Sequence, residues 1–133
     1  MTAARGTPNF VYKIYPKLET FQIPVPQSAD YIFPQDSLDK SSGYFHMSAQ
    51  DQMDDTLTLF FDAVETVQLV KIDYVRLNEA ETVKWELAPD NNAYPHLFAL
   101  LDGKYVVDVK AVDKGASWTE TVKKLADENW LEY

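Results

Sequence analysis

Six short stretches of the chain are rich in apolar residues. In most of them apolar and polar positions alternate with the period of two that is typical of β-strands. They cover residues 10–15, 44–47, 67–73, 83–87, 94–101 and 105–112. In the last stretch the alternation predicts an apolar face formed by Val107, Val109 and Ala111. Residues 16–42 contain four prolines and no such period, so we expect an irregular connection with one helical turn near residues 18–22.

Two further stretches have apolar residues at helical spacing. The first covers residues 49–61, where Ser48 is the expected N-cap and Asp51 takes the capping-box position. Its apolar stripe consists of Met53, Leu57, Phe60 and Phe61. The second follows Ser117, which forms a capping box with Glu120. Its inward-facing residues are Trp118, Val122, Leu125 and Ala126. Many strands and two main helices predict an α+β fold with a mixed, mostly antiparallel sheet.

Length and composition limit the number of domains and the environment. A chain of 133 residues suits a single domain, with residues 1–9 as a flexible tail. The chain contains no cysteine, and its first nine residues contain no apolar run that would indicate a signal peptide or a membrane span. We therefore expect a soluble protein of the cytoplasm, which at this size can also enter the nucleus. The sequence does not determine its oligomeric state.

The charge of the chain narrows the choice of partners. It has 12 basic and 21 acidic residues, a net charge of −9, and its lysines are scattered. Nucleic-acid binding depends on Lys and Arg that neutralise phosphates, so a nucleic acid is not an expected partner. A local pocket for one small molecule is compatible with this balance.

His46 is the first candidate for a functional side chain. It lies on the same strand face as Tyr44 and Ser48, opposite the expected core residues Phe45 and Met47, and close to a helix N-terminus. An imidazole with an adjacent hydroxyl at such a place can bind an anion or a ribose. The alternative is a histidine that only hydrogen-bonds a loop.

Glu86 and His96 are the other candidates. Glu86 shares a strand face with Lys84, away from Trp85, so it either holds a substrate hydroxyl or is a solvated acid paired with a lysine. His96 follows a proline among apolar residues and is either a pocket wall or a buried, satisfied histidine. No H-E-x-x-H, glycine-rich loop or G-x-S-x-G pattern is present, so no metal, phosphate loop or serine hydrolase site is expected.

One segment resembles a known family. Residues 38–48, L-D-K-S-S-G-Y-F-H-M-S, resemble the L-D-x-x-D-G-F-I-H-L-S pattern of the domain-of-unknown-function family 952 (DUF952). Three further pieces agree in order: V-Y-K-I at residues 11–14, W-E at 85–86 and Y-P-H-L-F at 94–98. Ser42 and Ala99 depart from the usual Asp and Gly. The resemblance implies a family core over residues 10–112 and a C-terminal helical extension over residues 113–133.

The resemblance also implies a function, because DUF952 is grouped distantly with the ADP-ribosyltransferase fold. The H-x-S element is similar to one in RNA 2′-phosphotransferases, which use NAD as a substrate. By this analogy the catalytic residues would be Glu86, which orients the ribose, and His46, which fixes it. The substrate-binding residues would be Lys13, Tyr44, Ser48, Trp85, Tyr94 and His96. Lys13 would pair with a phosphate, and a tyrosine would stack on a ring.

The sequence therefore leads to a small domain with an NAD-type nucleotide pocket that acts in ADP-ribosyl or phosphate transfer. In such a reaction a carboxylate stabilises the positive charge that develops on the ribose. Two other interpretations remain open at this point. One is a non-catalytic module that binds a small molecule or a peptide end in the same pocket, and the other is an interaction domain without a ligand. The acid-rich composition disfavours an RNA substrate.

Overall fold

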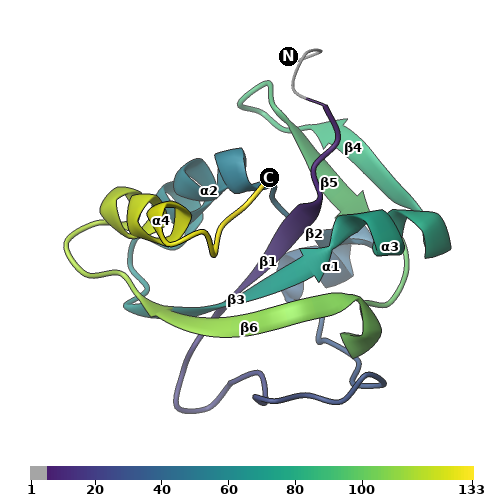
Figure 1. Ribbon diagram of the computed structural model, residues 1–133, viewed down its shortest axis with the longest axis horizontal. Coiled ribbons are helices and arrows are strands. Elements are labelled where there is room, and N and C mark those ends of the chain that lie inside the picture. The colour runs from purple at the N-terminus through teal and green to yellow at the C-terminus, as the bar shows by residue number, and fades with distance from the viewer. Residues whose placement is uncertain (1–5) are drawn as a thin grey trace.

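Two three-stranded antiparallel sheets form the framework of the computed structural model, which describes residues 6–133 (Figure 1). The first sheet has the order β1-β3-β6 and consists of β1 (Phe10–Pro16), β3 (Thr66–Asp73) and β6 (Val106–Asp113). The second has the order β2-β5-β4 and consists of β2 (Phe45–His46), β5 (Ala93–Leu97) and β4 (Val83–Leu87). The α+β class and the antiparallel pairing predicted from the sequence are confirmed.

The described residues also form four α-helices and two short 3₁₀ helices, and all but the last helix lie between strands. The α-helices are α1 (Ser37–Ser42), α2 (Met53–Phe60), α3 (Tyr74–Ala80) and α4 (Trp118–Asp127). The 3₁₀ helices are Gln50–Gln52 and Gly103–Tyr105. Ser117 caps α4 as predicted, and its side chain accepts a hydrogen bond from the backbone of Glu120. No helix in residues 6–133 is long and apolar enough to cross a membrane.

The first sheet is covered on both faces, so its alternating side chains enter two separate cores. One core lies between this sheet and helices α2 and α4, where Met53, Leu57 and Trp118 pack. The other contains Phe45 and Leu97 of the second sheet and Phe33 of the long 16–42 connection. Buried Gln68 fixes that connection, because its amide both accepts from and donates to the backbone of Ile23.

Local hydrogen bonds turn the chain from α1 into β2 and place His46. Asp36 caps α1 and forms a capping box with Asp39. Gly43 ends the helix with a φ of 86°, the left-handed conformation that glycine adopts without strain. β2 then pairs with β5 so that His46 lies directly opposite His96. β4 pairs with the other edge of β5, which brings Glu86 beside this pair of histidines.

Several sequence predictions differ from the structure. The helical turn at residues 18–22 is instead a turn closed by backbone bonds between Leu18 and Phe21. Helices α1 and α3 were not predicted, because six and seven residues are too short to show a helical period. Val107 is exposed, since a register shift near Lys71 changes which β6 side chains face the core, and Val109 and Val112 are buried. Residues 1–5 of the expected tail lie outside the described residues.

Candidate functional site

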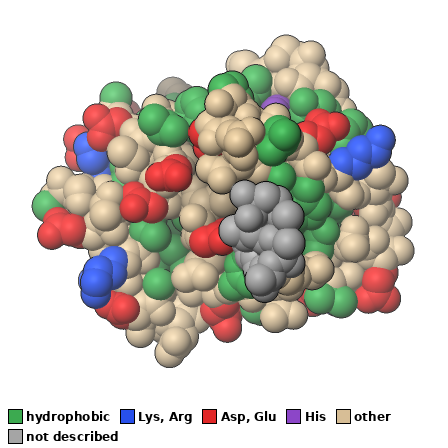
Figure 2. Space-filling view, turned by 90° about the horizontal axis from the view of Figure 1, so that it is seen from above, with side chains coloured by type: hydrophobic (Ala, Val, Ile, Leu, Met, Phe, Trp, Pro, Cys, Tyr) green, Lys and Arg blue, Asp and Glu red, His purple; other side chains and the backbone are tan. Residues whose placement is uncertain are grey.

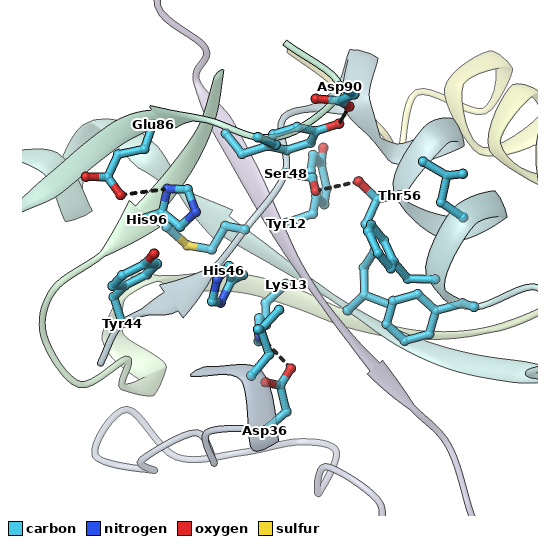
Figure 3. A pocket seen from close by; sticks show the side chains of 18 of the residues that line it. Tyr12, Lys13, Asp36, Tyr44, His46, Ser48, Thr56, Glu86, Asp90 and His96 are labelled. Carbon is cyan, nitrogen blue, oxygen red and sulfur yellow. Dashed lines mark hydrogen bonds and ion pairs between the residues drawn. The ribbon is translucent and has the colours of Figure 1, made fainter. Parts of the chain in front are cut away.

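A cleft of about 570 Å³ lies between the second sheet, β1 and the C-terminal end of α2 (Figure 3). This volume is in the range of small-molecule sites. Seven of the eight site residues predicted from the sequence line it: Lys13, Tyr44, His46, Ser48, Glu86, Tyr94 and His96. Further lining comes from Tyr12, Asp36, Thr56 and Asp90 and from an apolar rim that includes Leu38, Leu59, Phe60 and Leu87. The three residues His46, Glu86 and His96 therefore share one concave site.

A fully buried carboxylate, that of Asp39, organises one end of the cleft. Its Oδ1 accepts hydrogen bonds from the backbone N–H of His46 at 3.0 Å and from His46 Nδ1 at 2.8 Å. Its Oδ2 contacts Lys13 Nζ at 2.7 Å and accepts from the backbone N–H of Asp36 at 3.2 Å. Four donors thus occupy both oxygens, which satisfies the carboxylate completely.

The surroundings of Asp39 keep it ionised. Burial alone would raise the pKa of its carboxyl, but the hydrogen bonds from His46 and the charge of Lys13 outweigh this and lower the pKa to about 2. Lys13 also contacts Asp36 at 3.2 Å, and its own side chain is only 3% exposed. Its charge is therefore matched by two carboxylates. The predicted pairing of Lys13 with a ligand phosphate would have to compete with both of them.

The other end of the cleft contains His96 and Glu86. The ring of His96 lies 5.0 Å from that of His46, with an angle of 81° between their planes, and Tyr44 contacts both rings. Nδ1 of His96 faces Glu86 Oε1 at 4.0 Å and, although it is buried, has no hydrogen-bond partner among residues 6–133 (Figure 3). Burial and the neighbouring His46 lower the pKa of His96, so its ring is neutral at pH 7.

Hydroxyl groups also line the cleft beside these histidines. Ser48 Oγ lies 3.1 Å from Thr56 Oγ1 of α2, and the Tyr94 hydroxyl donates to Asp90 at 2.7 Å. The predicted N-cap role of Ser48 is wrong. The helical segment after it starts from Ala49, whose N–H bonds the side chain of Gln52, because the Ser48 side chain points into the cleft instead.

Trp85 is the one predicted site residue outside the cleft. Adjacent residues of a strand point to opposite faces, so Trp85 turns away from the cleft that its neighbour Glu86 lines. Its indole N–H donates to the Tyr74 hydroxyl at 2.9 Å, and the two rings are in edge contact. Trp85 was predicted to line the ligand pocket, and the structure instead places it outside the cleft.

Sequence reasoning missed Asp39, the residue that holds His46 and Lys13 together. A signal was present, because Asp39 belongs to the same L-D…H-x-S segment as His46 and lies seven residues before it. An acidic residue on a six-residue helix gives no periodic indication that it is buried. Thr56, Asp36 and Asp90 were likewise not singled out.

The cleft has an excess of acidic groups and an apolar rim. Among the described lining residues Lys13 is the only lysine or arginine, against the carboxylates of Asp36, Glu86 and Asp90. Phe60 of α2 and Leu87 of β4 both line the cleft and are 76% and 71% exposed. The surface in general has the same bias, and Figure 2 shows a face with acidic side chains spread among apolar ones and few basic groups. Within the described residues no group of three or more His, Cys, Asp or Glu could hold a metal ion.

Comparisons with known proteins support the fold. The family model described as "Protein of unknown function (DUF952)" matches residues 25–109. The crystal structure of protein CC0527 from Caulobacter crescentus is 25% identical, covers 90% of this chain and 96% of that chain, and gives a TM-score of 0.68. The solution NMR structure of CC0527 gives 25% identity, the same coverage and a TM-score of 0.65. No curated protein matches the chain. These descriptions state no ligand or activity, so the ADP-ribosyltransferase-like relationship stays a prediction.

Proposed function

The chain belongs to the DUF952 family, and we propose that its cleft binds a small uncharged or cationic molecule that combines a ring with hydrogen-bond donors. A nucleoside is such a molecule, and so is the nicotinamide riboside half of NAD. The observation that carries this proposal is the buried Asp39 carboxylate, which fixes the His46 ring at the cleft and neutralises Lys13.

The charge of the site supports a ligand without negative charge. Lys13 is nearly buried and lies between Asp36 and Asp39, while the side chain of Glu86 is 46% exposed at the cleft. A phosphate would meet carboxylates without a free lysine or arginine among the described lining residues. The NAD-type pocket expected from the sequence is thus narrowed to the half of NAD that carries the cationic ring and its ribose.

The hydrogen bonds of His46 support a ligand with a donor group. The contact between Nδ1 and Asp39 places the ring proton on Nδ1 and leaves Nε2 as an acceptor. The His46 side chain is 27% exposed, so its Nε2 acceptor remains partly accessible from the cleft. A ribose hydroxyl is a suitable donor, and Tyr44 and Tyr94 offer flat surfaces for a ring.

Titration with four nucleotide-related compounds tests this proposal. Nicotinamide riboside and adenosine are expected to shift the amide resonances of residues 44–49, whereas NAD and ADP-ribose bind at least about tenfold more weakly because of their diphosphate. His46→Ala removes the fixed acceptor and is expected to weaken riboside binding about tenfold. Glu79→Gln on the exposed side of α3, away from the cleft, is the matched control and leaves binding unchanged. Tighter binding of ADP-ribose than of the riboside would overturn the proposal.

Glycosidic cleavage of NAD is a second candidate function, and the position of Glu86 favours it. This carboxylate lines the cleft, and its nearest partner for an ion pair is His96 at 4.0 Å. Among the described residues no lysine or arginine forms an ion pair with this half-exposed carboxylate, so it can stabilise positive charge that develops on a bound ribose. Glu86→Gln is then expected to retain NAD binding and to lose most release of labelled nicotinamide. Equal release by the wild type and Glu86→Gln would remove this role from Glu86.

A further inference from the structure

We infer that His46 and His96 form a paired acceptor site for a planar cation with two adjacent N–H groups, an amidinium or guanidinium. This inference rests on the proposed function, since it assumes that the cleft binds a small molecule, and it assigns the charged group of that molecule. The two rings lie 5.0 Å apart at 81° and come from directly paired positions on β2 and β5.

The carboxylates behind the two rings determine which nitrogen accepts. Asp39 faces Nδ1 of His46 at 2.8 Å, and Glu86 faces Nδ1 of His96 at 4.0 Å. A proton on Nδ1 is favoured in both rings, because a lone pair there would face a negatively charged oxygen. Each neutral ring therefore has Nε2 as its acceptor. Both acceptors are assigned to one small ligand group, because the ring centres are only 5.0 Å apart.

The free Nδ1 of His96 indicates that this end of the site is incomplete without a ligand. The His96 residue is 8% exposed, and its buried Nδ1 has no hydrogen-bond partner, which costs free energy. A cation that donates to Nε2 makes the Nδ1–H a stronger donor. It would thereby draw the half-exposed Glu86 carboxylate from 4.0 Å into hydrogen-bonding distance.

Charge and shape favour a planar cation over an ammonium group. Asp39 and Glu86 stand behind the two rings, and the charge of Lys13 is matched by Asp36 and Asp39. The other lysine beside the histidines is Lys84, which pairs with His96 across the strands and whose ammonium lies over the Phe98 ring. The aromatic face of Tyr44, which contacts both imidazoles, attracts a delocalised cation. An amidinium has two parallel N–H groups and is more weakly hydrated than an ammonium.

Acid should abolish the site, because a protonated imidazole has no acceptor. The groups that face His46 are Asp39, Tyr44 and His96, and those that face His96 are Glu86, Tyr44, His46 and Lys84 of the paired position on β4. Protonation of either ring turns Nε2 into a donor and places a positive charge beside the cation. Binding of the cation is therefore expected to weaken as the pH falls from 7.5 to 5.

Three isosteric probes test this inference on the full chain. Benzamidine, benzamide and benzoate share one ring but carry a positive, a zero and a negative charge. We expect benzamidine to bind at least about tenfold more tightly than benzamide, measured from the amide resonances of residues 44–49, and benzoate to bind least. Glu86→Gln should weaken benzamidine about tenfold and leave benzamide unchanged, whereas Glu79→Gln should change neither. In the wild type, benzamidine binding should weaken as the pH falls from 7.5 to 5, and by more than benzamide binding does.

Two results would overturn the inference, and they leave the proposed function distinguishable. If benzamide binds as tightly as benzamidine while nicotinamide riboside shifts residues 44–49, the cation site is wrong and the small-molecule cleft stands. If neither the ring probes nor the nucleosides shift residues 44–49, both proposals fail.

Discussion

The two carboxylate–imidazole pairs of the cleft are built in opposite ways. In the Asp39–His46 pair the carboxylate is fully buried, the imidazole is 27% exposed, and the two groups hydrogen-bond at 2.8 Å. In the Glu86–His96 pair the imidazole is 10% exposed, the carboxylate is 46% exposed, and 4.0 Å separates them. The hydrogen bond of the first pair is already formed in the folded protein. The second is left unsatisfied, and unsatisfied groups at a cleft are the ones available to a ligand.

The difference follows from how the chain delivers each carboxylate. Asp39 reaches His46 from α1 across a seven-residue step, and the Asp36 cap and Lys13 complete its shell. Glu86 and His96 come from adjacent strands but not from directly paired positions, since Glu86 pairs with Tyr94. Diagonal neighbours on a sheet are farther apart than direct partners, so the contact stays long.

Removal of the Asp39 charge should disrupt the Asp39–His46 pair and reduce the free energy of unfolding more than any other change proposed here. Asp39→Asn would turn an amide N–H₂ toward donors and leave the nearly buried Lys13 with only the more exposed Asp36. We expect the free energy of unfolding to fall by about 3 kcal/mol, measured by urea denaturation. The matched control is Asp36→Asn, which keeps a good helix cap and removes a contact at 44% exposure. It should cost no more than about 1 kcal/mol.

Equal losses in the two variants would contradict this difference between buried and exposed partners of Lys13. A loss below about 1 kcal/mol in Asp39→Asn would show that the Asp39 shell is not fixed in the folded state.

Acid should separate the contributions of the two pairs. The folded pKa of Asp39, about 2, lies below its ordinary value of 3.8, so its contribution is present above pH 3.8 and is lost as the pH falls through 2. The shift corresponds to about 2 kcal/mol. The pKa of His96 is also lowered, so stability begins to fall earlier, as the pH drops below 6.5 and the unfolded chain takes up a proton that the folded ring excludes.

Urea denaturation from pH 7.5 to 2 of the wild type and Asp39→Asn measures these steps. Both proteins should lose stability below pH 6.5, whereas the difference between them should shrink by about 2 kcal/mol only below pH 3.8. A constant difference down to pH 2 would show that the ionised Asp39 carboxylate adds nothing to folding.

The difference between local and long-range contacts also determines how much of the molecule could be predicted from the sequence. Local inspection detects strands of five to eight residues, because β4 has a period of two and β3 is rich in apolar residues throughout. The capping box before α4 is equally local. The grouping of His46, Glu86 and His96 followed from the family-like motifs and the strand faces. The burial of Asp39 depends on Lys13, 26 residues earlier in the chain, and no local pattern shows that contact.

Trp85 and Ser48 illustrate two further limits of the sequence. Trp85 was included with Glu86 as a neighbour in sequence, although neighbouring strand residues point to opposite faces. Ser48 matched a capping pattern, but its hydroxyl contacts Thr56 in the cleft, a tertiary contact that overrides the local preference. The fold was therefore more predictable than the site, because the site depends on side-chain direction and on long-range contacts.

Neutralisation of Glu86 should alter the Glu86–His96 pair and give the smallest change in the free energy of unfolding. The carboxylate is 46% exposed and makes no hydrogen bond to His96, so Glu86→Gln should change the free energy of unfolding by no more than about 0.5 kcal/mol. The charge of Glu86 raises the pKa of His96 against burial and His46, so its removal should lower that pKa further. A ¹H–¹⁵N NMR titration of the His96 ring measures this shift, with Glu79→Gln as the matched control. A loss of 2 kcal/mol or more would show that Glu86 is as firmly built into the fold as Asp39. An unchanged His96 titration together with unchanged stability would show that Glu86 and His96 do not interact. Asp39–His46 would then be the only carboxylate–imidazole pair of the two.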